Sequence, residues 1–223
     1  MTPTRPAAAQ RHSPGIGKKV RSAGGIFFIG GRKGSMSSKP SMAIKLGDLL
    51  VNPKGGKFFP VCAEDGGPAV WQCDWIRILW HPTAYNGEDA RRLPLCLEPN
   101  QAAATELAGF EKALVAQLAA RSQTDPKLFG RMLTTQDTES RFVSCLKTST
   151  RGNSFIKLKV CLDQVRLWDA QGQSLPEMGD LSNRECKVRA ELKQVWMMSG
   201  QCGLLVEVTD LMLKEEEPQR CPF

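Results

Sequence analysis

The amino-acid sequence predicts a mainly β protein with one helix, preceded by a disordered basic arm. Three observations lead to this fold class. Short apolar runs that alternate with polar residues recur along most of the chain, and turns rich in glycine and proline separate them. A single segment repeats its apolar residues at helical spacing. The beginning of the chain is basic, has no acidic residue and offers little that a core could bury.

The predicted arm comprises residues 1–41 and is rich in proline, alanine, serine, glycine and basic residues. Nine lysines and arginines precede the first acidic residue, Asp48, whereas the rest of the chain holds 21 basic and 23 acidic residues. The net charge of +7 therefore comes from the beginning of the chain. Three interpretations fit equally well: an arm for nucleic acid, an organelle transit peptide or an inert solvated leader. For the first, the candidate phosphate contacts are Lys18, Lys19, Arg21, Arg32 and Lys33.

A first block of strands is expected after the arm, in residues 42–98. Its apolar runs are separated by turn sequences such as Asn52-Pro53-Lys54-Gly55-Gly56. The run from Trp75 to Trp80 is almost entirely apolar, which is typical of a buried strand. The expected strands are 43–51, 57–62, 69–73, 75–80 and 92–97.

The predicted helix covers residues 100–122. Asn100 can cap its first turn. Leu107, Phe110, Leu114 and Leu118 recur at helical spacing and form one apolar face, which indicates packing against a sheet or barrel.

A second block of strands follows the helix. The expected strands are 128–133, 142–148, 155–161, 165–168, 186–198 and 203–213, and the last two form a hairpin. Two β blocks on either side of a helix favour a closed or partly open barrel, such as an OB-fold elaborated with extra strands. The predicted organisation is therefore an arm (1–41), a β-rich OB-like body (42–214) and a polar tail (215–223).

Most kinds of catalytic and cofactor chemistry find no support in the sequence. The chain has two histidines, no zinc-like spacing of cysteine and histidine, and no phosphate-binding glycine motif, so no cofactor, metal or enzymatic activity is expected. The eight cysteines lack paired spacing, and no secretory signal precedes them, which favours reduced thiols inside a cell. No apolar run reaches the roughly 20 residues of a membrane helix.

Candidate binding residues lie on the strands of the second β block. The runs 155–160 and 187–193 alternate apolar and charged side chains, so each predicts a strand with one buried face and one mostly basic face. A basic face with aromatic rings suits single-stranded nucleic acid, in which both phosphates and bases are accessible. The candidates for stacking are Phe155, Trp168 and Trp196; for each tryptophan, filling the core is the more common role of so large a ring. The candidates for phosphate contact are Lys157, Lys159, Lys187, Arg189 and Lys193.

The segment 186–208 resembles the closing hairpin of single-stranded DNA-binding proteins of large double-stranded DNA viruses. It has a strand ending in Trp196 and apolar residues, a turn ending in Gly203, and a Val206-Glu207-Val208 strand. The order of a β block, a helix, a basic strand and a hairpin is also similar, over about residues 42–213. The turn departs from that family in carrying Gln201-Cys202 where a basic–aromatic pair is usual. The resemblance implies an OB-like fold and the protection of single strands during replication, recombination or repair.

The expected function is therefore the binding of single-stranded DNA or RNA with little sequence preference. The alternative is a structural or scaffold subunit of a viral or ribonucleoprotein assembly, in which the arm binds nucleic acid or a neighbour. A third option is an enzyme that uses Cys96 or His81. Besides single-stranded nucleic acid, the expected partners are further copies of the chain or replication and assembly proteins, with no membrane. The expected location is a nucleus or a viral replication site, or an organelle if residues 1–41 are a transit peptide.

Overall fold

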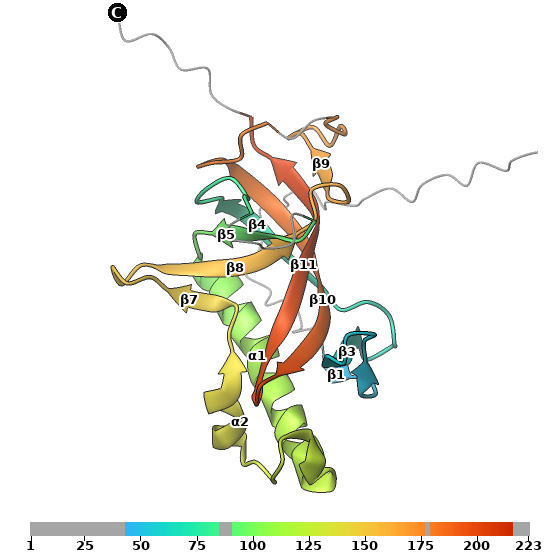
Figure 1. Cartoon of the computed structure of the whole chain (residues 1–223). Coiled ribbons are helices and arrows are strands. Elements are labelled where there is room, and N and C mark those ends of the chain that lie inside the picture. Colours follow the sequence, from blue (N-terminus) through green and yellow to red (C-terminus); the bar gives the residue numbers. More distant parts are fainter. Residues whose placement is uncertain (1–42, 85–90, 177–178, 216–223) are drawn as a thin grey trace, which may run out of the picture. The chain divides into compact units, whose positions relative to one another are not determined.

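The computed structural model describes residues 43–84, 91–176 and 179–215 (Figure 1). The predicted basic arm, with Lys18, Lys19, Arg21, Arg32 and Lys33, lies outside the described residues, as does the tail beyond residue 215. The division into arm, body and tail therefore stays a prediction.

The described strands pair into one mixed sheet, and its centre is a long hairpin of β10 (Glu185–Met198) and β11 (Gln201–Leu213). One half of β10 pairs with β4 (Val70–Arg77) and the other with β3 (Lys57–Ala63), both antiparallel. Along β11, three short partners pair in parallel: β6 (Phe142–Val143), β8 (Ser154–Val160) and β9 (Arg166–Trp168). The sheet is completed by β1 (Ile44–Leu46) and β2 (Leu50–Val51) on β3, and by β5 (Leu93–Leu97) and β7 (Leu146–Thr148) on β8.

Part of this sheet curls into a partly open barrel. Its ladders run in the order β4, β10, β11, β8 and β5. The chain beyond β4 then returns to β5 through a bridge between Ile78 and Leu97 and a hydrogen bond of 2.9 Å from the Leu79 N–H to the Cys96 carbonyl. Figure 1 shows β8 crossing the β10–β11 hairpin. The mainly β, OB-like fold class is thus confirmed.

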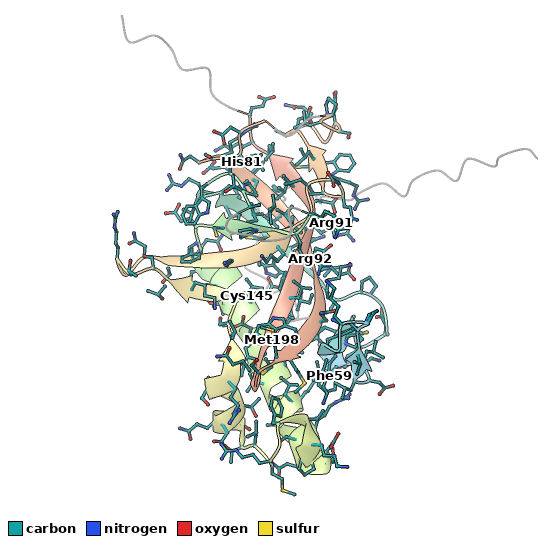
Figure 2. All side chains as sticks on the ribbon, viewed as in Figure 1. Phe59, His81, Arg91, Arg92, Cys145 and Met198 are labelled. Carbon is teal, nitrogen blue, oxygen red and sulfur yellow. The ribbon has the colours of Figure 1, made fainter. Side chains whose placement is uncertain are left out.

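The predicted helix is α1 (Gln101–Thr124), and it packs on the core as expected. The Asn100 side chain accepts a hydrogen bond of 2.8 Å from the Ala103 N–H, which caps the first turn. Leu107, Phe110, Leu114 and Leu118 are all buried. The buried carboxylate of Glu111 accepts hydrogen bonds of 2.6 Å from the Cys145 N–H and the Ser144 hydroxyl, which holds the segment before β7 against the helix (Figure 2).

Side chains of α1 also cover the free edge of β1. The Gln117 side chain accepts a hydrogen bond from the Leu46 N–H and donates one to the Ile44 carbonyl, both at 2.9 Å. Arg121 donates to the Leu46 carbonyl at 2.8 Å. These contacts take the place of a neighbouring strand, so an edge that could otherwise pair with another chain is closed.

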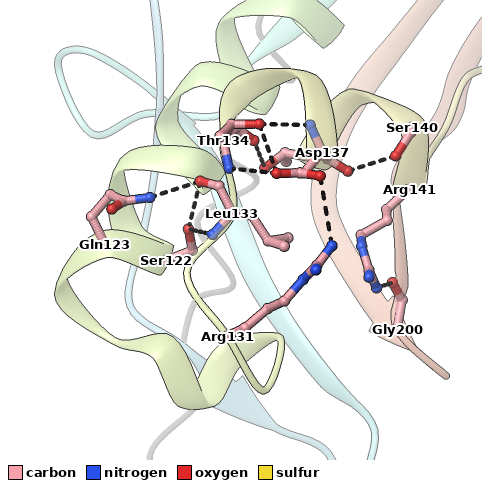
Figure 3. A network of polar contacts seen from close by, with 10 residues as sticks. Ser122, Gln123, Arg131, Leu133, Thr134, Asp137, Ser140, Arg141 and Gly200 are labelled. Atoms are coloured by element: carbon pink, nitrogen blue, oxygen red, sulfur yellow. Dashed lines mark hydrogen bonds and ion pairs between the residues drawn. The ribbon is translucent and has the colours of Figure 1, made fainter.

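A short helix that the sequence analysis missed, α2 (Thr135–Arg141), lies between α1 and the hairpin turn (Figure 3). A capping box begins it: the Thr134 hydroxyl accepts from the Asp137 N–H, and the Asp137 carboxylate accepts from the Thr134 N–H. Hydrogen bonds from the Thr134 side chain and backbone lower the pKa of Asp137. At the other end, Arg141 donates to the Gly200 carbonyl at 3.0 Å and so joins α2 to the hairpin turn.

One expected strand was wrong. Residues 128–133 contain the end of a 3-10 turn, η1 (Pro126–Leu128), and a loop in place of a strand. Pro126 cannot donate to a ladder, and Gly130 adopts a φ of +75°. The apolar residues Leu128 and Phe129 pack against the core from this loop, so they mimic a strand in sequence.

Seven cysteines lie in the described residues, and all seven are free thiols, six of them buried. Cys221 lies outside the described residues, and the reduced state of the thiols in the cell stays a prediction. Along the described parts of the chain, no helix combines the length and hydropathy needed to span a membrane.

Candidate nucleic-acid interface

The sheet has an outer face, on the side away from the core, and it carries the predicted contact residues of β8 and β10. In β10, Cys186, Val188 and Ala190 are buried, so the residues between them, Lys187 and Arg189, lie on the outer face. The same alternation in β8 leaves three predicted contacts outside: Phe155, Lys157 and Lys159. The two rows meet through β11, because β11 pairs with both strands.

An exposed tryptophan and a lysine meet where β4 pairs with β10. The side chain of Trp75 is 40% exposed, and the Lys187 ammonium lies 5.1 Å from the centre of its ring. Lys187 Nζ is also 3.3 Å from Asp74 Oδ1, but the Asp74 side chain is almost fully exposed, so water screens that attraction. The Arg189 guanidinium has no carboxylate partner among the described residues. A phosphate would therefore find two cations beside an accessible ring.

Trp168 lies on the same outer face, beyond β11, whereas Trp75 lies on the opposite side of β10. Its neighbour in the ladder is Met212, which is itself opposite Lys187. The Trp168 indole N–H donates a hydrogen bond of 3.1 Å to the fully buried Asp210 carboxylate, and Arg166 forms an ion pair with that carboxylate at 2.7 Å. The ring is thus held in one orientation. We call Trp75, Trp168, Lys187 and Arg189 the barrel face; the strands that carry its two rings, β4 and β9, lie about 14 Å apart.

A second aromatic site lies near the closed end of the β10–β11 hairpin. Trp196 is paired with Gly203 on one side and with Phe58 on the other. A groove of about 320 Å³ runs beside the Trp196 ring, and Lys57, Phe58 and Met198 are among the residues that line it. Figure 2 shows Met198 near this end of the hairpin, and its side chain is 68% exposed. We call Lys57, Phe58, Trp196 and Met198 the tip groove.

Gly203 allows the Trp196 ring to lie against the strand. A Cβ atom at Gly203 would sit 2.6 Å from Cζ2 of Trp196 and 2.9 Å from the Val143 carbonyl oxygen, too close for any side chain. The indole is thereby supported on one side by backbone. Trp196 and Gly203, two residues on which the sequence resemblance rests, thus form one contact in the structure.

The cations of the outer face are partly neutralised by acids beside them. Lys193, at a register shift in β10, forms an ion pair of 2.5 Å with Glu191. Arg92 pairs with Glu207 at 3.3 Å where β8 crosses β11 (Figure 2). Lys157, in contrast, is exposed and has no ion-pair partner within the described ranges. Lys157 and Arg189 are therefore the predicted cations that are most available to a phosphate.

The structure brings the predicted contacts together only in part. Lys187, Arg189 and Trp168 share the barrel face, Trp196 lies in the tip groove with Lys193 just before it, and Phe155, Lys157 and Lys159 line β8. The expectation that the run from Trp75 to Trp80 is buried was wrong for both ends, because Trp75 is 40% and Trp80 43% exposed. The alternation with buried Ile76 and Ile78 would have placed Trp75 on the outer face. It would not have revealed the exposure of Trp80, which follows the end of β4.

The residues proposed for the enzyme alternative lie in two separate places. Cys96 is buried within β5. His81 lies beyond β4 and contacts a loop: its Nδ1 accepts a hydrogen bond from the Leu181 N–H, and its own N–H donates to the Ser182 hydroxyl oxygen. The Ser182 hydroxyl thus contacts the backbone of His81 rather than its ring, which is not the arrangement that activates a nucleophile. The described residues contain no group of three or more His, Cys, Asp or Glu side chains placed to hold a metal ion.

Comparison with known proteins gives similarity to solved structures only. No family model and no curated protein sequence matches the chain. It is similar to gp2.5, a single-stranded DNA-binding protein encoded by bacteriophage T7, with a TM-score of 0.46 and 14% identity over 70% of this chain and 91% of that chain. It is also similar to the single-stranded DNA-binding protein from bacteriophage Enc34, with a TM-score of 0.41 and 11% identity over 80% of this chain and 94% of that chain.

The Enc34 protein in complex with single-stranded DNA matches with a TM-score of 0.43 and 13% identity, over 79% of this chain and 99% of that chain. These neighbours are phage proteins, and the narrower resemblance to proteins of large double-stranded DNA viruses stays a prediction. At TM-scores below 0.5, the likeness does not decide what this chain binds.

Proposed function

We propose that this protein binds single-stranded DNA or RNA along the outer face of its sheet, with little sequence preference and without a catalytic step. The observation that carries the proposal is the placement of part-exposed tryptophans beside cations: Trp75 with Lys187 and Arg189 on the barrel face, and Trp196 with Lys57 in the tip groove.

Stacking on these rings supports a single strand over a duplex. Bases in a duplex already stack on one another and are closed to protein rings, whereas single-stranded bases are free to stack on aromatic side chains. Each stacked base contributes about 1–3 kcal/mol, and every base offers a ring to stack, so the binding tolerates any sequence. Lys187 lies 5.1 Å from the Trp75 ring centre, so it can bind the phosphate next to a stacked base.

The basic arm has a supporting role in this proposal. Its cations attract any polyanion at long range and without regard to strandedness. Discrimination between single and double strands therefore belongs to the sheet face. Such a protein would coat single strands that arise in replication, recombination or repair, at the site in the cell where they form.

The test compares single-stranded and duplex oligonucleotides by fluorescence anisotropy. It uses the full chain and a variant in which Lys18, Lys19, Arg21, Arg32 and Lys33 are changed to Gln. The proposal expects the arm variant to bind more weakly overall but to keep its preference for the single strand. Loss of all binding in the arm variant, with no preference in the unmodified chain, would instead favour the scaffold alternative.

A further inference from the structure

Trp80 and Phe155 form an aromatic pair apart from both the barrel face and the tip groove. Their ring centres are 6.1 Å apart and their planes meet at 57°. Trp80 follows the end of β4, and Phe155 lies on the outer face of β8. Beside them lies a groove of about 530 Å³, whose other lining residues are Leu79, Glu98, Pro99, Ser149, Asn153 and Ser154.

The exposure of this pair is not explained by packing. A tryptophan normally buries most of its large surface in a core, yet 43% of Trp80 is exposed. Phe155 is also only half-buried, although its neighbour Ile156 is completely buried. Two rings, one from the segment after β4 and one from β8, are thus presented to solvent at a groove large enough for a small ligand.

The charges near the pair favour an anion. Lys157 is next to Phe155 on the outer row of β8 and has no ion-pair partner in the described residues, and Lys147 is directly opposite Phe155 in the β7–β8 ladder. The one carboxylate that lines the groove, that of Glu98, is held at 2.6 Å by Arg77. The groove therefore offers aromatic rings, ammonium groups nearby, and hydroxyl and amide groups that can bond to a base or sugar.

We propose that the Trp80–Phe155 groove is a second stacking subsite, which binds a base of the same single strand while Lys157 binds an adjacent phosphate. This inference rests on the proposed function. Lys159 of β8 pairs with Glu207 of β11, and Phe155 lies four residues before Lys159. Gly203, beneath Trp196, likewise lies four residues before Glu207. Because β8 crosses β11 (Figure 1), the two segments diverge from this pair, and each spans about 13 Å, so a short oligonucleotide fills one site and a longer one reaches both.

The test measures the affinity of the full chain for oligothymidylates of about 5 and about 20 nucleotides. The variants are Trp80→Ala, Trp80→Phe, Trp196→Ala and, as a control at an exposed residue in the loop before α2, Met132→Ala. We expect Trp80→Ala to weaken binding of the longer oligomer by about 5- to 150-fold, the loss of one stacked base, and to leave the shorter one unchanged. Trp80→Phe should restore most of the affinity, and Trp196→Ala should weaken both lengths.

The outcomes separate the subsite from the proposed function. Unchanged affinity of Trp80→Ala for both lengths overturns the subsite and leaves the function standing. An equal loss of affinity at both lengths, with an unchanged melting temperature, also overturns the subsite. Trp80 and Phe155 would then belong to the site that the shorter oligomer already fills. If the unmodified chain binds neither oligomer, the proposed function and the subsite both fail.

Discussion

At the scale of single residues, the contact between Trp196 and Gly203 links fold and binding. The backbone of Gly203 supports one side of the indole, and the tip groove runs beside the ring. A base that stacks on Trp196 therefore meets a ring that is already held in place. Little side-chain entropy of Trp196 is lost on binding.

We predict that Gly203→Ala destabilises the protein by about 1–3 kcal/mol, since the methyl group would overlap Trp196 and the Val143 carbonyl. Urea denaturation measures this loss. The matched control is Gly109→Ala on the exposed side of α1, where an added Cβ meets nothing within 4 Å; it should stabilise the protein by about 0.5–1 kcal/mol. A neutral Gly203→Ala variant would mean that the indole does not rest on this strand.

A second prediction concerns the thiols. Burial raises the pKa of Cys73 and Cys202 to about 11 and that of Cys186 to about 12, from an ordinary value of 9.0. The thiolate is the reactive form, so these cysteines should resist a thiol reagent at pH 8 until the protein unfolds. In a Cys221→Ser background, we expect Cys62, which is only half-buried, to react first.

The same thiols should make the protein less stable in alkali. Above pH 9 they ionise in the unfolded chain while they stay protonated in the folded one, so stability falls as the pH rises through 9 to 12. Below pH 9 they have no effect on stability. Rapid labelling of several thiols in the native protein at pH 8 would contradict this account of the core.

At the scale of elements, the attachment of α1 to β1 depends on few side chains. Gln117 bonds to both the N–H of Leu46 and the carbonyl of Ile44, as a neighbouring strand would. We predict that Gln117→Ala destabilises the protein by about 1–3 kcal/mol, because it leaves two partly buried backbone groups without partners. Thermal or urea unfolding tests this against Lys112→Ala, on the exposed side of the same helix. Equal stability of the two variants would contradict the role of Gln117.

Elements with strong periodicity could be predicted from the sequence, whereas short ones could not. The four apolar residues of α1 fall at helical spacing, and the alternation in β10 runs over most of its length, so both were found. α2 has about two turns, all of polar residues, and its capping box from Thr134 to Asp137 was the only signal. Its position depends on the contact of Arg141 with Gly200, 59 residues away, which no local pattern contains.

At the scale of the whole molecule, the sequence indicated the kind of site but not its layout. The alternation of lysines with apolar residues in β8 and β10 correctly identified an outer basic face. Which tryptophans lie on that face depends on pairing between distant strands, as when Trp75 of β4 meets Lys187 of β10. The sequence could not reveal this pairing. It also could not reveal that Asp210 accepts a hydrogen bond from the indole of Trp168.

The binding should depend strongly on salt, because each neutralised phosphate of a single strand contributes about −0.7 to the slope of log K against log salt. If four cations of the face contact phosphates, the slope is about −3. We predict that Arg189→Gln reduces the steepness of the slope by about 0.7 in an anisotropy titration. Lys112→Gln on α1 removes the same charge away from the face and should leave the slope unchanged. Equal slopes for the two variants would exclude Arg189 as a phosphate contact.

The most direct test of the central claim is the anisotropy of a labelled single strand and its duplex, titrated with the full chain and with Trp196→Ala, both carrying the five substitutions to Gln in the arm. We predict that the chain with Trp196 prefers the single strand, and that Trp196→Ala weakens single-strand binding by about 5- to 150-fold while duplex binding changes little. Equal affinity for both nucleic acids, unchanged by Trp196→Ala, would contradict the assignment of the sheet face as a single-strand site.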